Sequence, residues 1–264
     1  MVELNKLYNM DCLEGMKQIA DKSVDMILCD LPYGTTACKW DSVIPFEPLW
    51  EQYNRITKQN AAIVMFSAQP FTTDLINSNR KMFRYEIIWE KTVSSGFFHA
   101  NQMPLRIHEN ICVFYNKLPT YNPIKHIREN SLLKIGTVKN NIRNRSKQYN
   151  LPPHGVPYIE TGERYPTDVI KFANWNGGGF IKSKTREKTS HPTQKPVPLC
   201  EYLINTYTNE GSVVLDNCMG SGTTAIAAIR TGRNWIGFEK DKDYFNSAVK
   251  RIETEISQIK LCEA

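Results

Sequence analysis

Two glycines followed by a carboxylate, near the C-terminal end of the sequence, have the spacing of a nucleotide-cofactor site. Gly220 and Gly222 come soon after a short apolar run that ends at Asp216, and Glu239 ends the next apolar run. Glycine permits backbone conformations and close approaches that a Cβ forbids. A carboxylate roughly 20 residues beyond such a turn is placed to accept hydrogen bonds from a ribose. The segment therefore indicates half of a site for an adenosine-containing cofactor.

Two other interpretations of the glycine turn are open. The pattern GxxxxGK[ST] of an ATP-binding phosphate loop is absent, and no lysine lies between Gly222 and Lys240, which argues against ATP hydrolysis. The other interpretation is a tight strand-to-helix turn in which glycine only avoids a steric clash. The spacing to Glu239 favours the cofactor site.

A second group of residues able to do chemistry comes early in the chain. Asp30 ends the apolar run 24–29 and is followed by Leu31, Pro32 and Tyr33. A carboxylate, a turn stiffened by proline and an aromatic ring are thus expected together at the carboxyl end of a strand, where open α/β sheets bind ligands. An ordinary strand end followed by a Pro-Tyr turn is the alternative.

Strands and helices in alternation have to position these residues. Apolar runs predict strands over residues 6–9, 24–30, 61–66, 83–90, 110–115, 213–215 and 235–238. Helical spacing predicts helices over residues 13–19, 46–57, 70–78, 199–206, 225–229 and 244–259. Thr223 and Thr224 are expected to cap the helix after the glycine turn, and Gly232 to end it. The alternation is typical of a mostly parallel sheet covered by helices on both faces.

The loop 91–106 connects two of the predicted strands. Its tip is apolar, with Phe97 and Phe98 directly after Gly96. The sequence leaves open whether this tip is a lid over the site or part of the core.

Length and composition limit the class of protein. The 264 residues suffice for one large α/β domain with an insertion. Seven cysteines without CxxC or a Cys/His pairing indicate neither a metal site nor a disulfide framework, and reduced thiols fit a cytoplasmic protein. The N-terminal residues lack the apolar stretch of a signal peptide, and no run of about eighteen apolar residues occurs, so neither secretion nor a membrane span is expected.

Positive charge is concentrated in one region. The whole chain has a net charge of +6, but residues 118–190 contain thirteen Lys/Arg and five Asp/Glu, a local net charge of +8. This region has weak periodicity, and its basic residues are interleaved with aromatic ones, as in surfaces that bind nucleic acid. A flexible, solvated basic loop is the alternative. The candidate phosphate-binding residues are Lys125, Arg128, Lys134, Lys139, Arg143, Arg145 and Lys147.

Three motifs together resemble one protein family. They are the tetrapeptide from Asp30 to Tyr33, the hexapeptide HPTQKP at residues 191–196 and the sequence DNCMGSGTT at residues 216–224. In this order they resemble the catalytic motif, the cofactor-flanking motif and the cofactor loop of amino-methylating DNA methyltransferases, in the permuted arrangement called the beta class. The resemblance covers nearly the whole chain except the basic region, and three motifs agree in order and spacing.

The resemblance implies a fold and a domain organisation. The fold would be the circularly permuted, Rossmann-like α/β sheet of S-adenosylmethionine-dependent methyltransferases, with helices on both faces and an inserted basic recognition region. Residues 1–117 would form the catalytic half of the methyltransferase domain. Residues 118–190 would form the target-recognition insertion, and residues 191–264 the cofactor-binding half.

The resemblance also implies a reaction, the transfer of a methyl group from S-adenosylmethionine to the exocyclic N6 of an adenine flipped out of double-stranded DNA. Asp30 and the Leu31 carbonyl would each accept an N–H of the amine, which directs its lone pair at the sulfonium methyl, and Tyr33 would stack on the base. The family usually has a further proline where Leu31 stands. Because only a carbonyl is needed there, the change is expected to cost stiffness and not an acceptor.

The same pattern implies the cofactor-binding residues. The methionine part of the cofactor would lie along Asp216, Gly220, Ser221 and Gly222. Glu239 would bind the ribose hydroxyls, and Asp11 would lie near the adenine. Thr193 and Lys195 would lie beside the cofactor carboxylate, with stabilisation of the following helix as the alternative for Lys195.

Other functions are weighed against adenine methylation. Aspartate at the first position favours adenine by family habit, because cytosine-N4 enzymes more often carry serine there. Intact Asp30, Pro32 and Tyr33 argue against a DNA-binding protein that has lost catalysis, and asparagine in place of Asp30 would better support a methyltransferase acting on structured RNA or on protein amides. Double-stranded DNA is the expected partner. A homodimer and a cognate restriction endonuclease are further candidate partners.

Overall fold

The computed structural model describes residues 2–35, 41–127, 138–139, 158–159, 162–174 and 194–263. The chain divides into two compact units. The larger consists of Met1–Asn122 and Asp168–Ala264, and the smaller is Pro123–Thr167. The region predicted to recognise the target, residues 118–190, lies only partly within the described residues.

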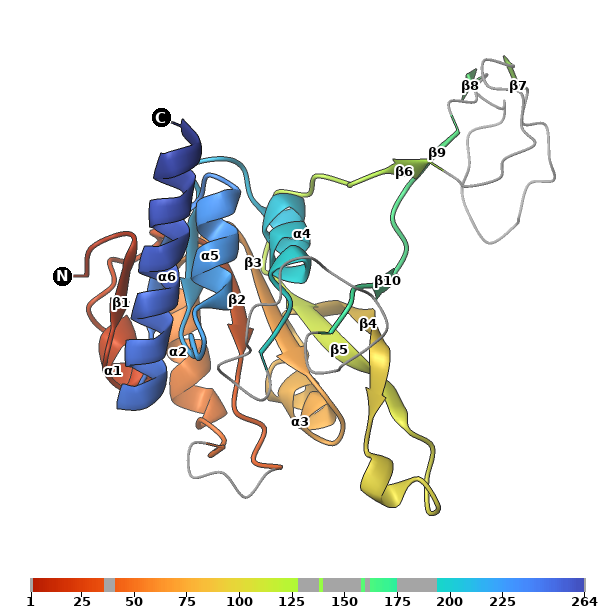
Figure 1. The fold of residues 1–264 in the computed structure, drawn as a ribbon, viewed down its shortest axis with the longest axis horizontal. Helices are drawn as coiled ribbons and strands as arrows, with labels where there is room; N and C mark the ends of the chain where they lie inside the picture. The colour runs from red at the N-terminus through yellow and green to blue at the C-terminus, as the bar shows by residue number, and fades with distance from the viewer. Residues whose placement is uncertain are drawn as a thin grey trace. The chain divides into compact units, whose positions relative to one another are not determined.

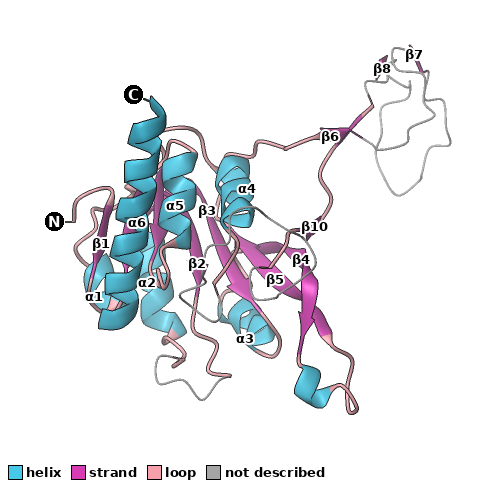
Figure 2. Ribbon diagram, in the orientation of Figure 1, coloured by secondary structure: helices cyan, strands magenta, loops and turns pink. Residues whose placement is uncertain are grey.

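The larger unit is built on an eight-stranded sheet with the order β1-β12-β11-β2-β3-β5-β4-β10 (Figures 1 and 2). Its strands are β1 (Lys6–Tyr8), β2 (Val24–Asp30), β3 (Thr57–Ser67), β4 (Phe83–Ser95), β5 (Arg106–Phe114), β10 (Val169–Lys171), β11 (Val213–Asp216) and β12 (Asn234–Phe238). Neighbouring strands are parallel, except that β5 runs antiparallel to both β3 and β4. The predicted mostly parallel α/β sheet is confirmed.

Helices cover both faces of this sheet (Figure 2). They are α1 (Cys12–Met16), α2 (Phe46–Ile56), α3 (Phe71–Ser78), α4 (Val197–Tyr207), α5 (Thr223–Arg230) and α6 (Lys242–Glu263). One apolar cluster joins one face of the sheet to α4, α5 and α6, and a second joins the other face to α1, α2 and α3. Along β2, Met26 and Leu28 belong to the first cluster, and Ile27 and Cys29 to the second. This alternation is that of a strand buried on both sides.

β4 and β5 are longer than predicted. They continue into the segment that was predicted as the loop 91–106, and the short 3₁₀ helix η1 (Phe97–His99) forms the turn between them. Their hairpin extends away from the rest of the sheet, as the yellow segment of Figure 1 shows.

The turn into α5 differs from the prediction. Gly222, with a φ of +81°, occupies the N-cap, and no side chain caps the helix. Thr223 and Thr224 lie in the first helical turn instead, so the predicted capping by threonine is wrong. A Cβ on Gly222 would also lie 3.3 Å from the Ile252 side chain in α6. The predicted helix end at Gly232 is confirmed, because this residue follows the C-cap with a φ of +70°.

The smaller unit contains two short antiparallel ladders. β6 (His126–Ile127) pairs with β9 (Glu163–Arg164), and β7 (Val138–Lys139) pairs with β8 (Tyr158–Ile159). Beside the first ladder, Lys125 Nζ lies 3.1 Å from Glu163 Oε2.

Candidate active site

The carboxyl ends of three neighbouring strands bring together acidic residues from distant parts of the sequence. Asp30 ends β2, Asp216 ends β11 and Glu239 directly follows β12. β11 pairs in parallel with both of the other strands, and Asp216 lies opposite Gly237 of β12. Because neighbouring parallel strands end at the same edge of a sheet, the three carboxylates share the edge at which such sheets bind ligands.

Asp30 is held by two hydrogen-bond donors. The Tyr33 hydroxyl donates to Oδ1 at 2.7 Å, and Lys195 Nζ donates to Oδ2 at 2.6 Å. Bonds between ionised groups at this distance are short and strong. A carboxylate has about four acceptor positions, so Asp30 is fixed in orientation and can still accept a further N–H.

Tyr33 is fixed beside Asp30 by packing as well as by its hydrogen bond. Its ring stacks on Phe71, with the ring centroids 4.9 Å apart, and Lys195 Nζ lies 5.9 Å from the Tyr33 centroid. Burial, followed by the charge of Asp30, raises the pKa of Tyr33 well above its ordinary value. The phenol therefore remains a hydrogen-bond donor to Asp30 throughout the neutral pH range.

Leu31, which stands where the family usually has a proline, is only 3% exposed. Its side chain belongs to the apolar cluster on the α1, α2 and α3 face of the sheet. Burial of a leucine side chain is worth about 1.5–3 kcal/mol. The side chain thus anchors the turn between Asp30 and Pro32 to the core, which offsets the loss of the stiffness that a proline ring would supply.

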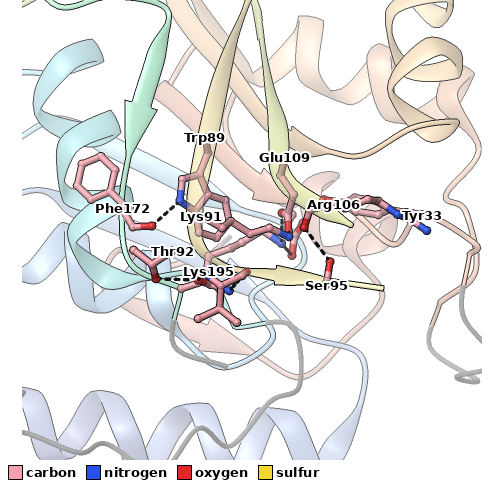
Figure 3. Close-up of polar contacts among 12 residues, drawn as sticks. Tyr33, Trp89, Lys91, Thr92, Ser95, Arg106, Glu109, Phe172 and Lys195 are labelled. Atoms are coloured by element: carbon pink, nitrogen blue, oxygen red, sulfur yellow. Dashed lines mark hydrogen bonds and ion pairs between the residues drawn. The ribbon is translucent and has the colours of Figure 1, made fainter. Parts of the chain in front are cut away.

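Lys195 belongs to a larger ionic network (Figure 3). Its Nζ lies 3.4 Å from Glu109 Oε2, and Glu109 Oε1 lies 3.1 Å from Lys91 Nζ. Burial favours the neutral form of Lys195, but Asp30 and Glu109 outweigh burial and raise its pKa. Burial likewise favours the neutral form of Glu109, but Lys195 and Lys91 outweigh it and lower the pKa of this carboxyl. Lys195 and Glu109 are therefore charged at neutral pH.

Sequence analysis did not single out Lys91 or Glu109. Lys91 lies directly after the predicted strand 83–90, and Glu109 lies directly before the predicted strand 110–115. A charged residue at each strand end was the available signal. The sequence could not show that β4 and β5 pair antiparallel. This pairing sets Glu90 opposite His108 and so brings their neighbours Lys91 and Glu109 together.

Lys195 was expected beside the cofactor carboxylate, and its ammonium group contacts Asp30 and Glu109 instead of the glycine turn. A direct role in cofactor binding stays a prediction, and Thr193 lies outside the described residues. Gln194, next to Lys195, is only 7% exposed, and its Oε1 has no hydrogen-bond partner among the described residues. A buried acceptor of this kind is what a bound ligand can satisfy.

Glu239 holds the glycine turn. Its Oε2 accepts the Gly220 N–H at 2.8 Å, and its Oε1 accepts the Asp241 N–H at 2.8 Å. Gly220 has a φ of +53°, and a Cβ there would meet nothing closer than the Cys218 carbonyl oxygen at 3.9 Å. Burial raises the pKa of Glu239, and the two backbone donors act against this shift. The turn is therefore open on the side where a ligand would pass Gly220.

Asp216 is buried at the start of the same turn, only 4% exposed. Its Oδ1 accepts the Cys218 N–H at 3.0 Å. Burial raises the pKa of Asp216 to about 7, against hydrogen bonds from Thr224 and Cys218 that lower it. A carboxyl group in this state favours a cationic ligand nearby, because a positive charge would offset the cost of ionising it.

Ser221 and Asp11 complete the set of predicted cofactor residues that the structure describes. Ser221 is buried, and its carbonyl accepts a hydrogen bond from Arg251 at 3.0 Å. Asp11 caps α1 by accepting the Leu13 N–H at 3.0 Å, and its other oxygen lies 3.3 Å from Lys240 Nζ. Asp11 therefore has a structural role of its own, at the same edge of the sheet as Glu239.

Two of the basic residues predicted to contact DNA, Lys125 and Lys139, lie within the described residues. Lys125 is exposed, pairs with Glu163 and lies 5.1 Å from the centroid of the Tyr165 ring. Lys139 lies in β7. The other predicted contacts lie outside the described residues, and they are Arg128, Lys134, Arg143, Arg145 and Lys147.

Two further properties concern only the part of the chain that the structure describes. In it, no group of three or more His, Cys, Asp or Glu residues could hold a metal ion. No helix within the described ranges is both long enough and apolar enough to cross a membrane.

Comparison with known families decides what kind of protein carries this site. The family model described as DNA methylase, N6/N4 type, matches residues 24–250. The chain belongs to the N6/N4 DNA methylase family. The matched residues include the ends of β2, β11 and β12, and they also include Lys91, Glu109 and Lys195.

Curated relatives of this methylase align along nearly its whole length. The type II methyltransferase M1.MboII of Moraxella bovis is 28% identical, over 94% of this chain and 96% of the relative. The DNA adenine methyltransferase YhdJ of Escherichia coli is also 28% identical, over 95% of this chain and 83% of the relative.

Solved structures share the fold. The M1.HpyAVI complex with SAM has a TM-score of 0.57 at 24% sequence identity and covers 93% of this chain and 98% of the solved chain. The PvuII DNA methyltransferase, described as cytosine-N4-specific, has a TM-score of 0.65 at 15% identity and covers 98% and 93% of the two chains. The predicted methyltransferase fold is confirmed.

Proposed function

We propose that this methylase transfers a methyl group from S-adenosylmethionine to the exocyclic N6 of an adenine that is flipped out of double-stranded DNA at a specific sequence. The observation that carries the proposal is Asp30. It ends β2 at the same edge as the glycine turn, and its carboxylate is oriented by Tyr33 on one oxygen and Lys195 on the other.

The chemistry of the target amine explains why an oriented carboxylate is useful. The lone pair of an exocyclic base nitrogen is delocalised into the ring, so the amine is a poor nucleophile. If Asp30 accepts one N–H and the Leu31 carbonyl accepts the other, the nitrogen is drawn toward tetrahedral geometry and its lone pair is localised. Acceptors that are fixed before the reaction need no reorganisation during it.

The ionic network supports this role for Asp30. Lys195 holds one oxygen of the Asp30 carboxylate, Glu109 pairs with Lys195, and Lys91 pairs with Glu109, so two ammonium groups and two carboxylates offset one another. Lys195 is thus a positioning residue. Asp30, the Leu31 carbonyl and Tyr33 are the groups proposed to touch the substrate.

The glycine turn and its surroundings fit S-adenosylmethionine, the cofactor that would supply the methyl group when bound. Gly220 is open toward a ligand, Asp216 is a buried carboxyl group that favours a cation, and Gln194 offers an acceptor without a donor. Glu239 and Asp11 would hold the ribose and adenine end. The solved structure of M1.HpyAVI as a complex with SAM supports the same donor.

Adenine is favoured over cytosine as the target by the aspartate at position 30 and by the similarity to an adenine methyltransferase, YhdJ. Cytosine-N4 methylation is the second candidate, because the fold is also that of a cytosine-N4-specific enzyme. The name of M1.MboII, a type II methyltransferase, supports a cognate restriction endonuclease that shares the recognition sequence. A homodimer stays a prediction.

One experiment tests the proposal directly. The purified protein is incubated with methyl-labelled S-adenosylmethionine and unmethylated genomic DNA, and the nucleosides are separated by mass spectrometry. N6-methyladenine in one sequence context is the expected product. N4-methylcytosine would replace the adenine assignment, and absence of transfer to DNA by the wild-type protein would overturn the function.

A further inference from the structure

The β4–β5 hairpin extends beyond the strands that flank it. β3 accompanies β5 only as far as the pair Ser67 and Asn110, and β10 accompanies β4 only as far as Lys171 and Glu90. Asn174 continues the support of β4 through two hydrogen bonds with the Val93 backbone. Beyond this point no described strand pairs with the hairpin. We call residues 94–107 the arm.

The tip of the arm is apolar and exposed. Gly96, with a φ of +93°, turns the chain into η1, where Phe97 is 62% exposed and Phe98 is 101% exposed. Met103 on the returning side is 49% exposed. Of the two roles left open by the sequence, a place in the core is therefore wrong for this tip. Clustered exposed aromatic residues on a soluble protein indicate a contact surface.

The arm projects from the edge that holds Asp30. β5 is antiparallel to both β3 and β4, so β4 runs in the same direction as β3 and β2, and its carboxyl end leaves the sheet at the same edge. The root of the arm carries Lys91 and Glu109 of the ionic network around Lys195 (Figure 3). The four residue-to-residue steps of strand from Lys91 to Ser95 add a reach of roughly 13 Å, comparable with the width of about 12 Å of the DNA major groove.

The charge of the arm favours a polyanion over a basic or a neutral apolar partner. From Lys91 to His108 the chain contains no aspartate or glutamate, while Arg106, His99 and His108 are basic and exposed. A two-stranded ribbon is a shape that enters the major groove, and apolar side chains wedged between bases are a known way to unstack them.

We propose that the arm contacts duplex DNA beside the target base and that Phe97 and Phe98 stack on the bases exposed when the target leaves the helix. This inference rests on the proposed function, because it supposes that the base is brought to Asp30. Flipping costs roughly a few kcal/mol, and aromatic stacking at the vacated position would offset part of that cost.

The test compares the double variant Phe97→Ala/Phe98→Ala with the wild type on duplexes that contain the methylation site mapped in genomic DNA. Methyl transfer is measured on a fully paired duplex with adenine at the target and on one with an abasic site opposite the target adenine, which lowers the cost of flipping. A third, fully paired duplex carries 2-aminopurine in place of the target adenine; it has no 6-amino group to methylate and reports flipping by its fluorescence. Leu261→Ala, which removes another exposed apolar side chain at the end of α6, is the matched control.

The double variant is expected to lose most of the fluorescence increase on the 2-aminopurine duplex, and on the order of tenfold to a hundredfold in kcat/KM on the paired adenine duplex. On the duplex with the abasic site most of the rate should return, and the affinity for S-adenosylmethionine should not change. The control variant should match the wild type in each measurement.

If the double variant loses kcat/KM equally on the paired adenine duplex and on the duplex with the abasic site, or loses none on either, the role of the arm is overturned and the proposed function is left intact. A change in sedimentation of the double variant without DNA would also overturn it, because the tip would then join two copies of the chain. Failure of the wild type to methylate DNA is a separate result that refutes the proposed function. Even in that case the fluorescence measurement still tests the arm: if the double variant gives the same 2-aminopurine fluorescence increase as the wild type, the proposed role of the arm is refuted.

Discussion

The hydrogen bonds to Asp30 illustrate how much of the site depends on single residues. Tyr33, three residues along the chain, and Lys195, far away in the sequence, hold its two oxygens. The first contact lies within the tetrapeptide, but the sequence predicted only that Tyr33 stacks on the base and not that it donates to Asp30. The position of Asp30 at a strand end was predictable from the apolar run before it. The second contact depends on the fold, since the order of strands in the sheet decides which residues meet at one edge.

Replacement of Asp30 by alanine is expected to abolish transfer while both ligands still bind. Loss of one preorganised transition-state hydrogen bond costs about 3–4 kcal/mol, on the order of a hundredfold to a thousandfold in rate. Single-turnover methyl transfer is measured beside cofactor and DNA affinities, with Asp30→Asn as the control that retains an acceptor. Near-normal transfer by the alanine variant, with folding intact, would refute the catalytic role.

Replacement of the buried Lys195 by methionine is expected to leave Asp30 and Glu109, two partly exposed neighbouring carboxylates, without their shared cation. Removal of one partner from a buried ionic group costs about 3–5 kcal/mol of stability. The double variant Lys195→Met/Asp30→Asn should be less destabilised than Lys195→Met alone, because Glu109 keeps its pair with Lys91 and the carboxylate left without a cation is gone. Lys195→Arg should be milder than either. Urea unfolding measures these three variants and Asp30→Asn alone, and strict additivity would show that the residues do not act as a network.

Asp216 should make stability depend on pH. Folding raises its pKa from 3.8 to about 7, so between these values the folded state binds the proton more tightly than the unfolded chain. The contribution of Asp216 to the free energy of unfolding therefore falls as pH rises from about 4 to about 7. Above pH 7 the contribution is most unfavourable, lower by at most about 4 kcal/mol than at low pH. Asp216→Asn, which keeps the acceptor for the Cys218 N–H, should gain stability relative to wild type from pH 5 to pH 8 in urea unfolding. A constant difference across this range would contradict the assignment.

At the level of elements, strand and helix positions in the larger unit were largely predictable, because apolar runs such as 24–30 and 213–215 are buried on both faces and carry a clear signal. The direction of β5 was not, since a period of two is the same for parallel and antiparallel strands. The continuation of β4 and β5 into the segment predicted as the loop 91–106 was missed for a related reason. Its residues pair only within the hairpin and so lack the apolar pattern of a buried strand.

The two glycines of the cofactor turn are expected to respond differently to substitution. At Gly220 an added Cβ meets open space, so Gly220→Ala should lower S-adenosylmethionine affinity with a modest loss of stability from its φ of +53°. At Gly222 the Cβ would press on Ile252 and Ala248 of α6, so Gly222→Ala should mainly destabilise the protein. Calorimetric titration and thermal unfolding separate the two effects. The reverse pattern would move the cofactor from Gly220 to Gly222.

For the whole molecule, the sequence predicted a methyltransferase body and a separate basic region, but not that β10 returns to the edge of the main sheet. β10 is only three residues long, and its pairing with β4 leaves no periodic signal within residues 118–190. Charge was the more informative property there. With +8 in that region against +6 for the whole chain, the remaining residues are slightly acidic, so attraction to DNA is concentrated where recognition is expected.

This distribution predicts that DNA binding weakens steeply with salt and that single charges in the basic region contribute measurably. If Arg143 neutralises one phosphate, Arg143→Ala should lower the slope of log K against log salt concentration by about 0.9, because one fewer counterion is released on binding. Lys17→Ala is the control, since Lys17 lies in the larger unit and pairs with Glu14 at 2.7 Å. Fluorescence anisotropy over a range of salt concentrations gives both slopes. If the Arg143 variant keeps the wild-type slope, or the Lys17 variant loses as much, binding does not depend on the basic region in the way that its charge indicates.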